Sequence, residues 1–542
     1  MTQKTQMETI NLSTDVLVVG TGMAGMKAAL EIAANGYQVV LIDENVAARN
    51  SVADLDGNEP AALEALQKAV DGSEKIEMLA DTCMDGVAGV PGDFRVWLAG
   101  RDDIVEKTVG AIVVATELVV SPLNEAYGLE LSDTVISQSQ LETVLANDPS
   151  AFSGKTVAFT LGLAQDGNPV VLERMLKSVL AMKNLEDTSV YVFTGDLKVA
   201  EDGLERLYLE CRDKGAMYVK LTDIPAAKQE GDTLSITYDD PVLQRGVSLT
   251  PDIIVIEEAI GADRANASLA EMLRIDVGSQ GFLQTDNVHR FPVGTNREGI
   301  FVVGGSRRVK KRYGDLMDAE NAALRVRSLL GDGTIAVPAD KAVLDTGKCT
   351  FCLTCYRCCP HGAIYWTAEN KPVISKVACQ GCGICASECP MDAIQIGEFK
   401  DADMIERITR SATEASDGPT IVAFCCQNSG LEAAGMAESF GMPLPKGLKT
   451  VVVPCAGKID IDYEMRALAE GADGVVVMAC HNGNCKSEKG SLYAAWRTAS
   501  ARDMLEAMGV PRDRIRFYTT ASNMGADFSA KLMEAEAALM QD

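Results

Sequence analysis

Residues 15–43, DVLVVGTGMAGMKAALEIAANGYQVVLID, decide the fold of the N-terminal part of the chain. The apolar run 15–19 predicts a buried parallel strand, a helix follows to about residue 34, Gly36 breaks it, and 38–42 predicts a second strand. The glycines of GTGMAG stand where the first strand turns into the helix. At that position backbone N–H groups and the positive end of the helix dipole receive the phosphates of a dinucleotide. The stretch therefore predicts a βαβ dinucleotide-binding unit, with a glycine-rich core turn as the alternative.

The surrounding sequence indicates which residues would hold the dinucleotide. The first glycine permits the tight turn, the second lets the backbone approach a pyrophosphate, and the third allows close packing of helix on strand. Asp43 ends the second strand, where a ribose-binding carboxylate belongs. Residues 110–116 and 299–305 predict further buried strands that end in small residues. Residues 156–162 open another strand and helix but lack the full glycine fingerprint. We therefore expect a single dinucleotide site, and we favour FAD over NAD(P) as its ligand. The candidate cofactor-binding residues are Gly20, Gly22, Met23, Ala24, Gly25, Asp43, Glu44, Ala115, Thr116, Gly304, Gly305 and Lys311.

A basic run follows Gly304-Gly305 in an otherwise acidic chain. A cation at this place would stabilise a reduced, anionic flavin by Coulomb attraction. A solvated loop or a partner-docking patch is the alternative. The run consists of Arg307, Arg308, Lys310, Lys311 and Arg312.

The strongest pattern in the chain is a cysteine motif that recurs after 30 residues. Residues 349–360, CTFCLTCYRCCP, and 379–390, CQGCGICASECP, share the spacing C-x₂-C-x₂-C-x₃-C-P. Two-cluster bacterial ferredoxins have this spacing, and the fourth cysteine of each motif ligates the other cluster. Zinc is the competing metal, but structural zinc sites pair two cysteines with two more distant ligands. We expect one [4Fe-4S] cluster on Cys349, Cys352, Cys355 and Cys389, and a second on Cys379, Cys382, Cys385 and Cys359.

A further cysteine set follows in the C-terminal part of the chain. Strands and helices alternate there, which predicts a doubly wound parallel sheet. Cys426, Cys455 and Cys480 each fall at the carboxyl end of a predicted strand, the edge at which such sheets bind ligands. Cys485 would be the fourth thiolate, and Cys425 should point to the opposite face from Cys426. The set predicts a [2Fe-2S] cluster or a small cubane, with zinc or unmetallated core cysteines as alternatives.

The composition narrows the class of protein. The 542 residues include 16 cysteines and 3 histidines, and 77 acidic against 50 basic residues give a net charge of -27. This balance argues against nucleic-acid binding, which needs clustered positive charge. The first fifteen residues lack the apolar core of a secretory signal, and no window holds about 18 consecutive apolar residues. We therefore expect a cytoplasmic protein whose reduced cysteines bind metal, with a disulfide framework as the weaker interpretation.

Together these patterns predict an α/β protein in three parts. Residues 1–340 would form an FAD-binding Rossmann-like domain of thioredoxin-reductase type, with an inserted structural α/β subdomain at about 150–285. Residues 341–400 would form an α+β ferredoxin-like insert with two [4Fe-4S] clusters. Residues 415–542 would form a doubly wound α/β iron–sulfur domain.

In this order the segments resemble two known families. Those before and through the ferredoxin repeat look like the A subunit of heterodisulfide reductase, and those from about 420 onward look like the delta subunit of methyl-viologen-reducing hydrogenase. The first resemblance rests on residues 20–43, 92–96, 110–116, 207–219 and 299–305, and the second on GADGV at 471–475 and CHNGNC at 480–485. The resemblance implies a cytoplasmic FAD and iron–sulfur electron relay within a multisubunit complex. Some members of the heterodisulfide reductase family bifurcate electrons. The resemblance also implies that FAD is held by Gly20, Gly22, Gly25 and Asp43, and a [2Fe-2S] cluster by Cys426, Cys455, Cys480 and Cys485.

The chain departs from these families at several positions. Residues 161–176 contain no cysteine, where the heterodisulfide reductase family usually binds an additional cluster. Glu117 stands where a glycine usually follows Ala115-Thr116, and Ser429 stands where the delta subunit often has cysteine. The missing middle cluster is shared with a fused subunit of the quinone-interacting membrane-bound oxidoreductase, which gives an alternative assignment.

We therefore expect an electron-transfer subunit of an oxidoreductase of anaerobic metabolism, without catalytic residues beyond the cofactors. Electrons would enter or leave through the C-terminal domain, pass through FAD and exchange with the two cubanes. The expected partners are heterodisulfide reductase B/C-like subunits and hydrogenase-like or formate dehydrogenase-like modules. We expect a homo-oligomer within a larger assembly, with no nucleic acid and no direct membrane span. The alternatives are a self-contained NAD(P)H-dependent flavin reductase and a scaffold whose cysteines hold zinc.

Overall fold

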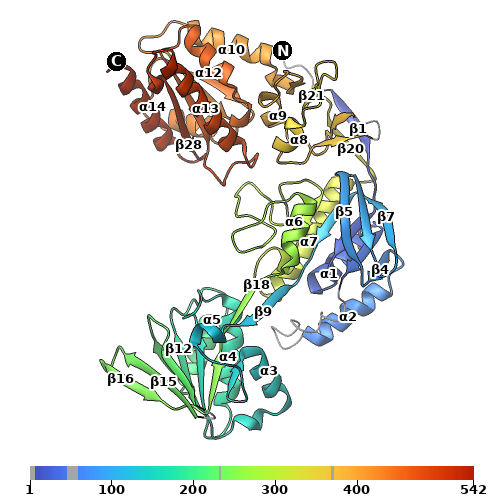
Figure 1. The fold of residues 1–542 in the computed structure, drawn as a ribbon, viewed down its shortest axis with the longest axis vertical. Helices are drawn as coiled ribbons and strands as arrows, with labels where there is room; N and C mark the ends of the chain where they lie inside the picture. Colours follow the sequence, from blue (N-terminus) through green and yellow to red (C-terminus); the bar gives the residue numbers. More distant parts are fainter. Residues whose placement is uncertain (1–5, 45–58, 231–232, 368–370, 542) are drawn as a thin grey trace.

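Three parallel sheets and a small cysteine-rich segment are arranged along one long axis (Figure 1). The computed structural model describes residues 6–44, 59–230, 233–367 and 371–541. An inserted sheet lies at one end of the axis, the C-terminal sheet at the other, and the N-terminal sheet between them (Figure 1). The α/β fold class predicted from the sequence is confirmed.

The N-terminal sheet has five parallel strands, which are apolar runs because both faces of the sheet are covered. Its order is β19 (Ile300–Val302), β8 (Ala111–Val114), β2 (Val16–Val19), β3 (Val39–Asp43) and β4 (Ile76–Ala80). One face of this sheet packs on helices α1 (Met23–Ala34) and α7 (Arg312–Leu330). The other face packs on helix α6 (Ala265–Leu273) and on an antiparallel sheet. The strands of that antiparallel sheet are β5 (Cys83–Val90), β6 (Asp93–Ala99) and β7 (Ile104–Val109). Small residues such as Ala28 and Ala322 let α1 and α7 pack closely. Helix α2 (Glu59–Asp71) and the antiparallel pair β1 (Met7–Asn11) and β20 (Thr334–Pro338) complete this part.

The inserted subdomain has its own five-stranded parallel sheet. Its strands are β10 (Val135–Ser137), β17 (Ile253–Ile256), β11 (Thr156–Leu161), β12 (Ser189–Thr194) and β13 (Met217–Lys220), and its helices are α3 (Gln138–Asn147), α4 (Pro169–Lys183) and α5 (Leu204–Asp213). A three-stranded antiparallel sheet, β14 (Ala226–Glu230), β15 (Thr233–Asp240) and β16 (Arg245–Leu249), extends from it. The antiparallel strands β9 (Leu118–Pro122) and β18 (Glu258–Ala262) join it to the N-terminal sheet. The buried guanidinium of Arg174 in α4 pairs with Glu258 at 2.9 Å, which holds this link against the subdomain.

The ferredoxin-like segment repeats one small unit, as its sequence does. The elements are β21 (Val343–Leu344), α8 (Thr354–Cys358), β22 (Ile364–Trp366), β23 (Pro372–Ile374), α9 (Ile384–Ser387) and β24 (Ile394–Gln395). Each half has a short helix followed by a strand, β22 in the first half and β24 in the second. Strand β22 pairs antiparallel with β23, which precedes the second helix, and β24 pairs antiparallel with β21, which precedes the first helix.

The C-terminal sheet is a four-stranded, doubly wound parallel sheet. Its order is β26 (Leu448–Val453), β25 (Ile421–Cys426), β27 (Gly474–Cys480) and β28 (Ile515–Thr520). One face packs on α11 (Gly430–Ser439) and α14 (Gly525–Leu539), and the other on α10 (Asp401–Thr413), α12 (Ile461–Ala469) and α13 (Gly490–Ala507). Among the described helices, none combines the length and the apolar character that a membrane crossing needs.

Candidate functional sites

A cavity of about 660 Å³ opens at the carboxyl ends of β2, β3 and β8, where parallel sheets bind ligands. Five of the residues predicted to hold a dinucleotide line it, namely Gly20, Asp43, Glu44, Ala115 and Thr116. Its volume is within the range of cofactor pockets. The residues present therefore form a pocket of suitable size at the predicted place.

The fingerprint glycines lie where side chains have no room. Gly20 has φ +108°, and a methyl group on it would collide with the carbonyl oxygen of Ala115. A methyl group on Gly25 would collide with the carbonyl of Gly20. Met23 begins α1 and Ala24 is buried. A methyl group on Gly304 would lie 2.5 Å from the Ala24 Cβ, and one on Gly305 would lie 2.8 Å from the backbone nitrogen of Leu118, so Gly304 packs against the fingerprint stretch and Gly305 against the segment between β8 and β9.

Asp43 is held at the mouth of this pocket by the fingerprint turn itself. The backbone N–H of Thr21 donates to its Oδ2 at 3.1 Å, and the Thr21 hydroxyl donates to the same oxygen. These bonds fix the carboxylate at the end of β3, where a ribose hydroxyl would meet it.

Glu117 occupies the space that the fingerprint leaves free. A methyl group on Gly22 would overlap the Glu117 carboxylate, which therefore lies against the N-cap residue of α1. Burial raises the pKa of Glu117 to about 7, and the carboxylates of Asp315, Asp43 and Asp263 add to the shift. The sequence showed Glu117 as a departure from a family pattern but gave no sign of this contact.

The basic run does not line the dinucleotide pocket. The Lys311 Nζ pairs with Glu173 of α4 at 2.8 Å, in the inserted subdomain. Arg307 Nη1 pairs with Asp318 Oδ1 at 2.9 Å, and Lys310 pairs with the same carboxylate. Lys311 therefore joins two parts of the chain, and its expected role toward FAD stays a prediction.

The first predicted cubane set is brought together around one small apolar hollow. Cys349, Cys352, Cys355 and Cys389 all line it, together with Trp366. The pKa of the Cys355 thiol is raised to about 11, mainly by burial and in part by the neighbouring Cys389, Cys349 and Cys352. The fourth cysteine of the second motif thus lies with the first three of the first motif.

The second predicted set is brought together in the same crossed manner. Cys379, Cys382 and Cys385 are buried, and Cys359 from the first motif lies close enough to raise the pKa of each. Burial is the largest cause in all three cases. The N–H of Gly381 donates to the Cys379 sulfur at 3.4 Å, a bond type that stabilises a thiolate.

The four C-terminal cysteines converge at the carboxyl edge of the C-terminal sheet. The sulfurs of Cys426 and Cys480 are 3.6 Å apart, and those of Cys455 and Cys485 are 4.0 Å apart. The Ser429 hydroxyl donates to the Cys480 sulfur at 3.1 Å, so this residue, which the sequence marked only as a departure, belongs to the same cluster of side chains.

Cys425 lies outside this set. It packs with α11 and α14 on the face of the sheet opposite Cys426. Burial alone raises its pKa, to about 12.

Within the described residues, no group of three or more His, Cys, Asp and Glu side chains is arranged for a single metal ion.

The second cubane set and the C-terminal set adjoin each other. A methyl group on Gly383 would lie 2.7 Å from the Cβ of Lys458, and one on Gly457 would lie 2.5 Å from the Cγ1 of Ile384. These glycines flank the cysteines, because Gly383 follows Cys382 and Gly457 lies two residues after Cys455 in the 3₁₀ turn η6 (Ala456–Lys458). Burial raises the pKa of Cys382 well above its usual value, and Cys455 is its next largest cause.

Polar contacts hold this junction, which we call the cysteine seam (Gly383–Glu388 against Gly457–Lys458). The Ser387 hydroxyl donates to the carbonyl of Lys458 at 2.7 Å. Arg497 of α13 pairs with Glu388 at 2.8 Å and donates to the carbonyl of Gly457 at 3.0 Å. The buried Lys458 Nζ pairs with Asp401 at 2.6 Å. Sequence reasoning missed the seam, because Gly383, Gly457 and Lys458 look like ordinary loop residues.

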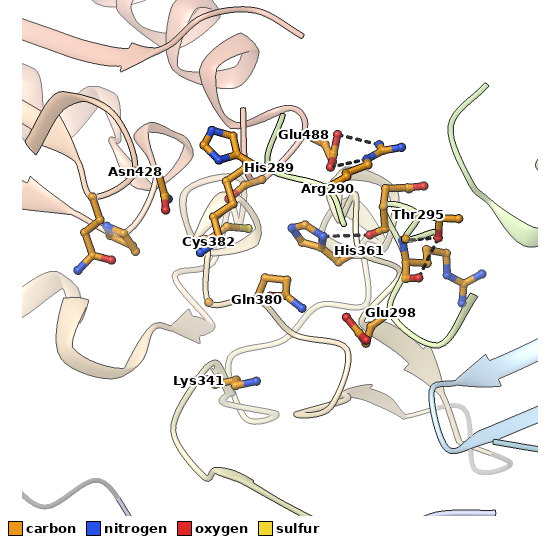
Figure 2. A pocket seen from close by; sticks show the side chains of 18 of the residues that line it. His289, Arg290, Thr295, Glu298, Lys341, His361, Gln380, Cys382, Asn428 and Glu488 are labelled. Carbon is orange, nitrogen blue, oxygen red and sulfur yellow. Dashed lines mark hydrogen bonds and ion pairs between the residues drawn. The ribbon is translucent and has the colours of Figure 1, made fainter. Parts of the chain in front are cut away.

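A second cavity, of about 390 Å³, lies beside the seam where all three parts of the chain meet. Figure 2 shows His361, Gln380 and Cys382 around the same open space. The His361 Nδ1 faces the carbonyl of Asn296 at 3.2 Å and therefore donates, while its Nε2 has no partner among the described residues. Burial lowers the His361 pKa to about 4, so the ring is neutral near pH 7.

The same region ties the loop of Cys485 to the dinucleotide-binding part. The amide of Asn287 donates to the carbonyl of Cys485 at 2.9 Å. Arg290 pairs with Glu488 at 2.9 Å, as the dashed lines in Figure 2 mark. The C-terminal cysteine site is therefore braced by both neighbouring parts of the chain.

Comparisons with known families agree with these sites in position. Residues 421–541 match the family described as methyl-viologen-reducing hydrogenase, delta subunit. Residues 15–67 match an FAD binding domain and residues 372–395 a 4Fe-4S binding domain. The predicted FAD-binding and ferredoxin-like parts are thereby confirmed at the level of domain type.

Relatives match both halves of the chain. It is 23% identical to the A subunit of the ferredoxin:CoB-CoM heterodisulfide reductase of Methanosarcina mazei over 80% of this chain and 57% of that one, so it spans little more than half of that relative. It is 39% identical to the iron-sulfur D subunit of the vhu F420-non-reducing hydrogenase of Methanocaldococcus jannaschii over 21% of this chain and 84% of that one. Among solved structures, Lactococcus lactis thioredoxin reductase aligns with a TM-score of 0.42 at 20% identity, covering 59% of this chain and all of that one.

Proposed function

We propose that this chain, whose C-terminal part belongs to the family of the methyl-viologen-reducing hydrogenase delta subunit, is an electron-transfer subunit of a heterodisulfide reductase-type complex. The observation that carries the proposal is the cysteine seam, where two sets of four cysteines adjoin within one chain. Electron carriers need short steps between centres, and the seam would place two such centres in adjoining sites.

The side chains fit four cofactors. The 660 Å³ pocket would hold FAD, with Asp43 toward the ribose and the N-terminus of α1 toward the pyrophosphate. The two crossed sets would each ligate a [4Fe-4S] cluster, and the C-terminal set a [2Fe-2S] cluster. When bound, a flavin exchanges electrons singly or in pairs and iron–sulfur clusters exchange them singly. We assign residues 1–340 to the FAD-binding part, 341–400 to the ferredoxin-like part and 415–542 to the delta-like part.

The seam supports a different electron route from the one expected from the sequence. That expectation placed FAD between the C-terminal centre and the cubanes. Because the loops that carry Cys382 and Cys455 pack on each other at Gly383 and Gly457, we propose that electrons cross directly between the C-terminal site and the second cubane site. The chain's own contribution is to hold these sites together, through Ser387 and Arg497, and to keep their sulfurs buried.

The relatives' names support a heterodisulfide reductase-like and a hydrogenase-like partner. Both relatives are named as subunits, one of a heterodisulfide reductase and the other of a hydrogenase, so both are parts of larger enzymes by name. We propose that this chain works in the cytoplasm between a hydrogenase-like or formate dehydrogenase-like donor and a heterodisulfide reductase B/C-like module. We propose a homo-oligomer within that assembly, in which the flavin relays electrons or splits them between two acceptors.

Anaerobic purification of the full chain tests the cofactor set. We expect about ten iron atoms and about one FAD per chain, because two [4Fe-4S] clusters and one [2Fe-2S] cluster sum to that iron content. Iron, acid-labile sulfide and flavin would be measured on the same sample. Stoichiometric zinc, about four irons, or no flavin after loading with FAD would contradict the proposal. Bleaching of the flavin by NADH alone would favour a self-contained reductase.

A further inference from the structure

The helix N-terminus in the dinucleotide pocket already faces a carboxylate of the chain. The second glycine of the fingerprint normally leaves space for a pyrophosphate to approach the backbone. Here a methyl group on Gly22 would overlap the carboxylate of Glu117 and would lie 3.2 Å from its Cγ. Gly22 is the N-cap of α1, and the first turn of α1 contains no acidic residue of its own. An anionic group from the segment that leads into β9 thus stands where phosphate oxygens would lie.

The described groups around Glu117 do not neutralise it. Asp43 from β3, Asp263 from the end of β18 and Asp315 from α7 all act on it as like charges. Lys310 lies close to Asp315, but burial lowers its pKa to about 7 and its amine is paired with Asp318. Cys83, which lines the same cavity, has a pKa raised by burial, so it stays a neutral thiol and adds no charge to the field. A pyrophosphate, with two negative charges, would therefore enter a field that is already negative.

We propose that Glu117 is a placeholder in the flavin site: its carboxylate occupies the pyrophosphate position, and FAD binds when protonation removes that charge and the neutral side chain moves aside. This rests on the proposed function, since it concerns the same flavin pocket. It couples flavin binding to the uptake of a proton, unlike a site in which glycine alone faces the phosphates.

The sign of the pH dependence follows from the charge. In the protein without flavin, the pKa of Glu117 is raised to about 7, so Glu117 is mostly neutral at pH 6 and mostly charged at pH 8. A bound pyrophosphate raises that pKa further, because like charges favour the protonated form. FAD binding above pH 7 therefore takes up a proton. The affinity of the chain for FAD should fall about tenfold from pH 6 to pH 8. The reason is that the protonated fraction of Glu117 falls about tenfold between one unit below and one unit above its pKa.

Titration of the flavin-free full chain with FAD tests this. The dissociation constant would be measured between pH 6 and pH 8 by calorimetry, in two buffers of different ionisation enthalpy to count protons. We expect Glu117→Gln to bind FAD at pH 8 about tenfold more tightly than the native chain and to lose the pH dependence. We expect Glu117→Gly to bind more tightly at every pH, because it also clears the space over Gly22. Glu74→Gln, which removes an exposed carboxylate of the same part, should behave as the native chain.

The outcomes separate this inference from the proposed function. If the native chain binds FAD with the same affinity at pH 6 and pH 8, and Glu117→Gln leaves that affinity unchanged, Glu117 is not a placeholder. The assignment of the pocket to FAD is then unaffected. Weaker binding by Glu117→Gln and Glu117→Gly would show that Glu117 helps to hold FAD, which also overturns the inference. If neither the native chain nor Glu117→Gly binds FAD at any pH, the flavin assignment itself fails and the inference falls with it.

Discussion

Replacing Cys455 by serine is expected to remove the C-terminal cluster and leave the other cofactors in place. The Cys455 sulfur lies 4.0 Å from that of Cys485 in a buried site, so neither water nor another side chain can take over from the lost thiolate without rearrangement. Iron should fall by about two of the expected ten atoms per chain, with unchanged flavin. Iron and sulfide analysis with the visible spectrum measures this.

The matched control is Cys425→Ala. Cys425 neighbours Cys426 in β25 and is as deeply buried, but it packs on the opposite face of the sheet. Its loss should leave the iron content unchanged. An iron content that falls in Cys425→Ala and holds in Cys455→Ser would show that the cluster lies on the other face.

Replacing Gly383 by alanine is expected to force the cysteine seam apart. Its φ is +84°, and the added methyl group would lie 2.7 Å from the Lys458 Cβ. The left-handed backbone costs about 1–2 kcal/mol with a side chain. Overpacking at a close contact adds about 1–3 kcal/mol. The midpoint of urea unfolding of the full chain, followed by cluster absorbance, should fall accordingly.

Gly381→Ala separates the two costs. Gly381 also has a positive φ, +65°, and flanks the same Cys382, but a methyl group on it would meet nothing within 4 Å among the described residues. Only the backbone cost of about 1–2 kcal/mol should appear. Equal destabilisation by the two variants would mean that the loops are not in contact at Gly383.

Local patterns predicted most of the fold and much of the sites. The fingerprint turn and the crossed ferredoxin sets follow from spacing within short segments, and strand ends placed Cys426, Cys455 and Cys480 on one edge. The opposite direction of Cys425 followed from the alternation of side chains along a strand.

The remaining features depend on contacts between segments that are far apart in sequence. Lys311 pairs with Glu173 because the inserted subdomain folds back on α7, and no local pattern contains that information. Gly383 and Gly457 are separated by 74 positions and become neighbours only when the ferredoxin-like part docks on the C-terminal sheet. The expected route through FAD came from the chemistry of the flavin, whereas the direct route that we propose rests on the contacts at the cysteine seam.

Low-temperature electron paramagnetic resonance of the fully reduced full chain tests the direct link across the seam. The two cubanes should couple to each other in every variant, so the informative signal is that of the C-terminal cluster, which the adjoining second cubane should broaden or split in the native chain. In Cys455→Ser this additional coupling should vanish while the cubane signals persist. A native C-terminal signal without such coupling, together with a cubane region unchanged by Cys455→Ser, would contradict direct electron transfer between the second cubane and the C-terminal cluster.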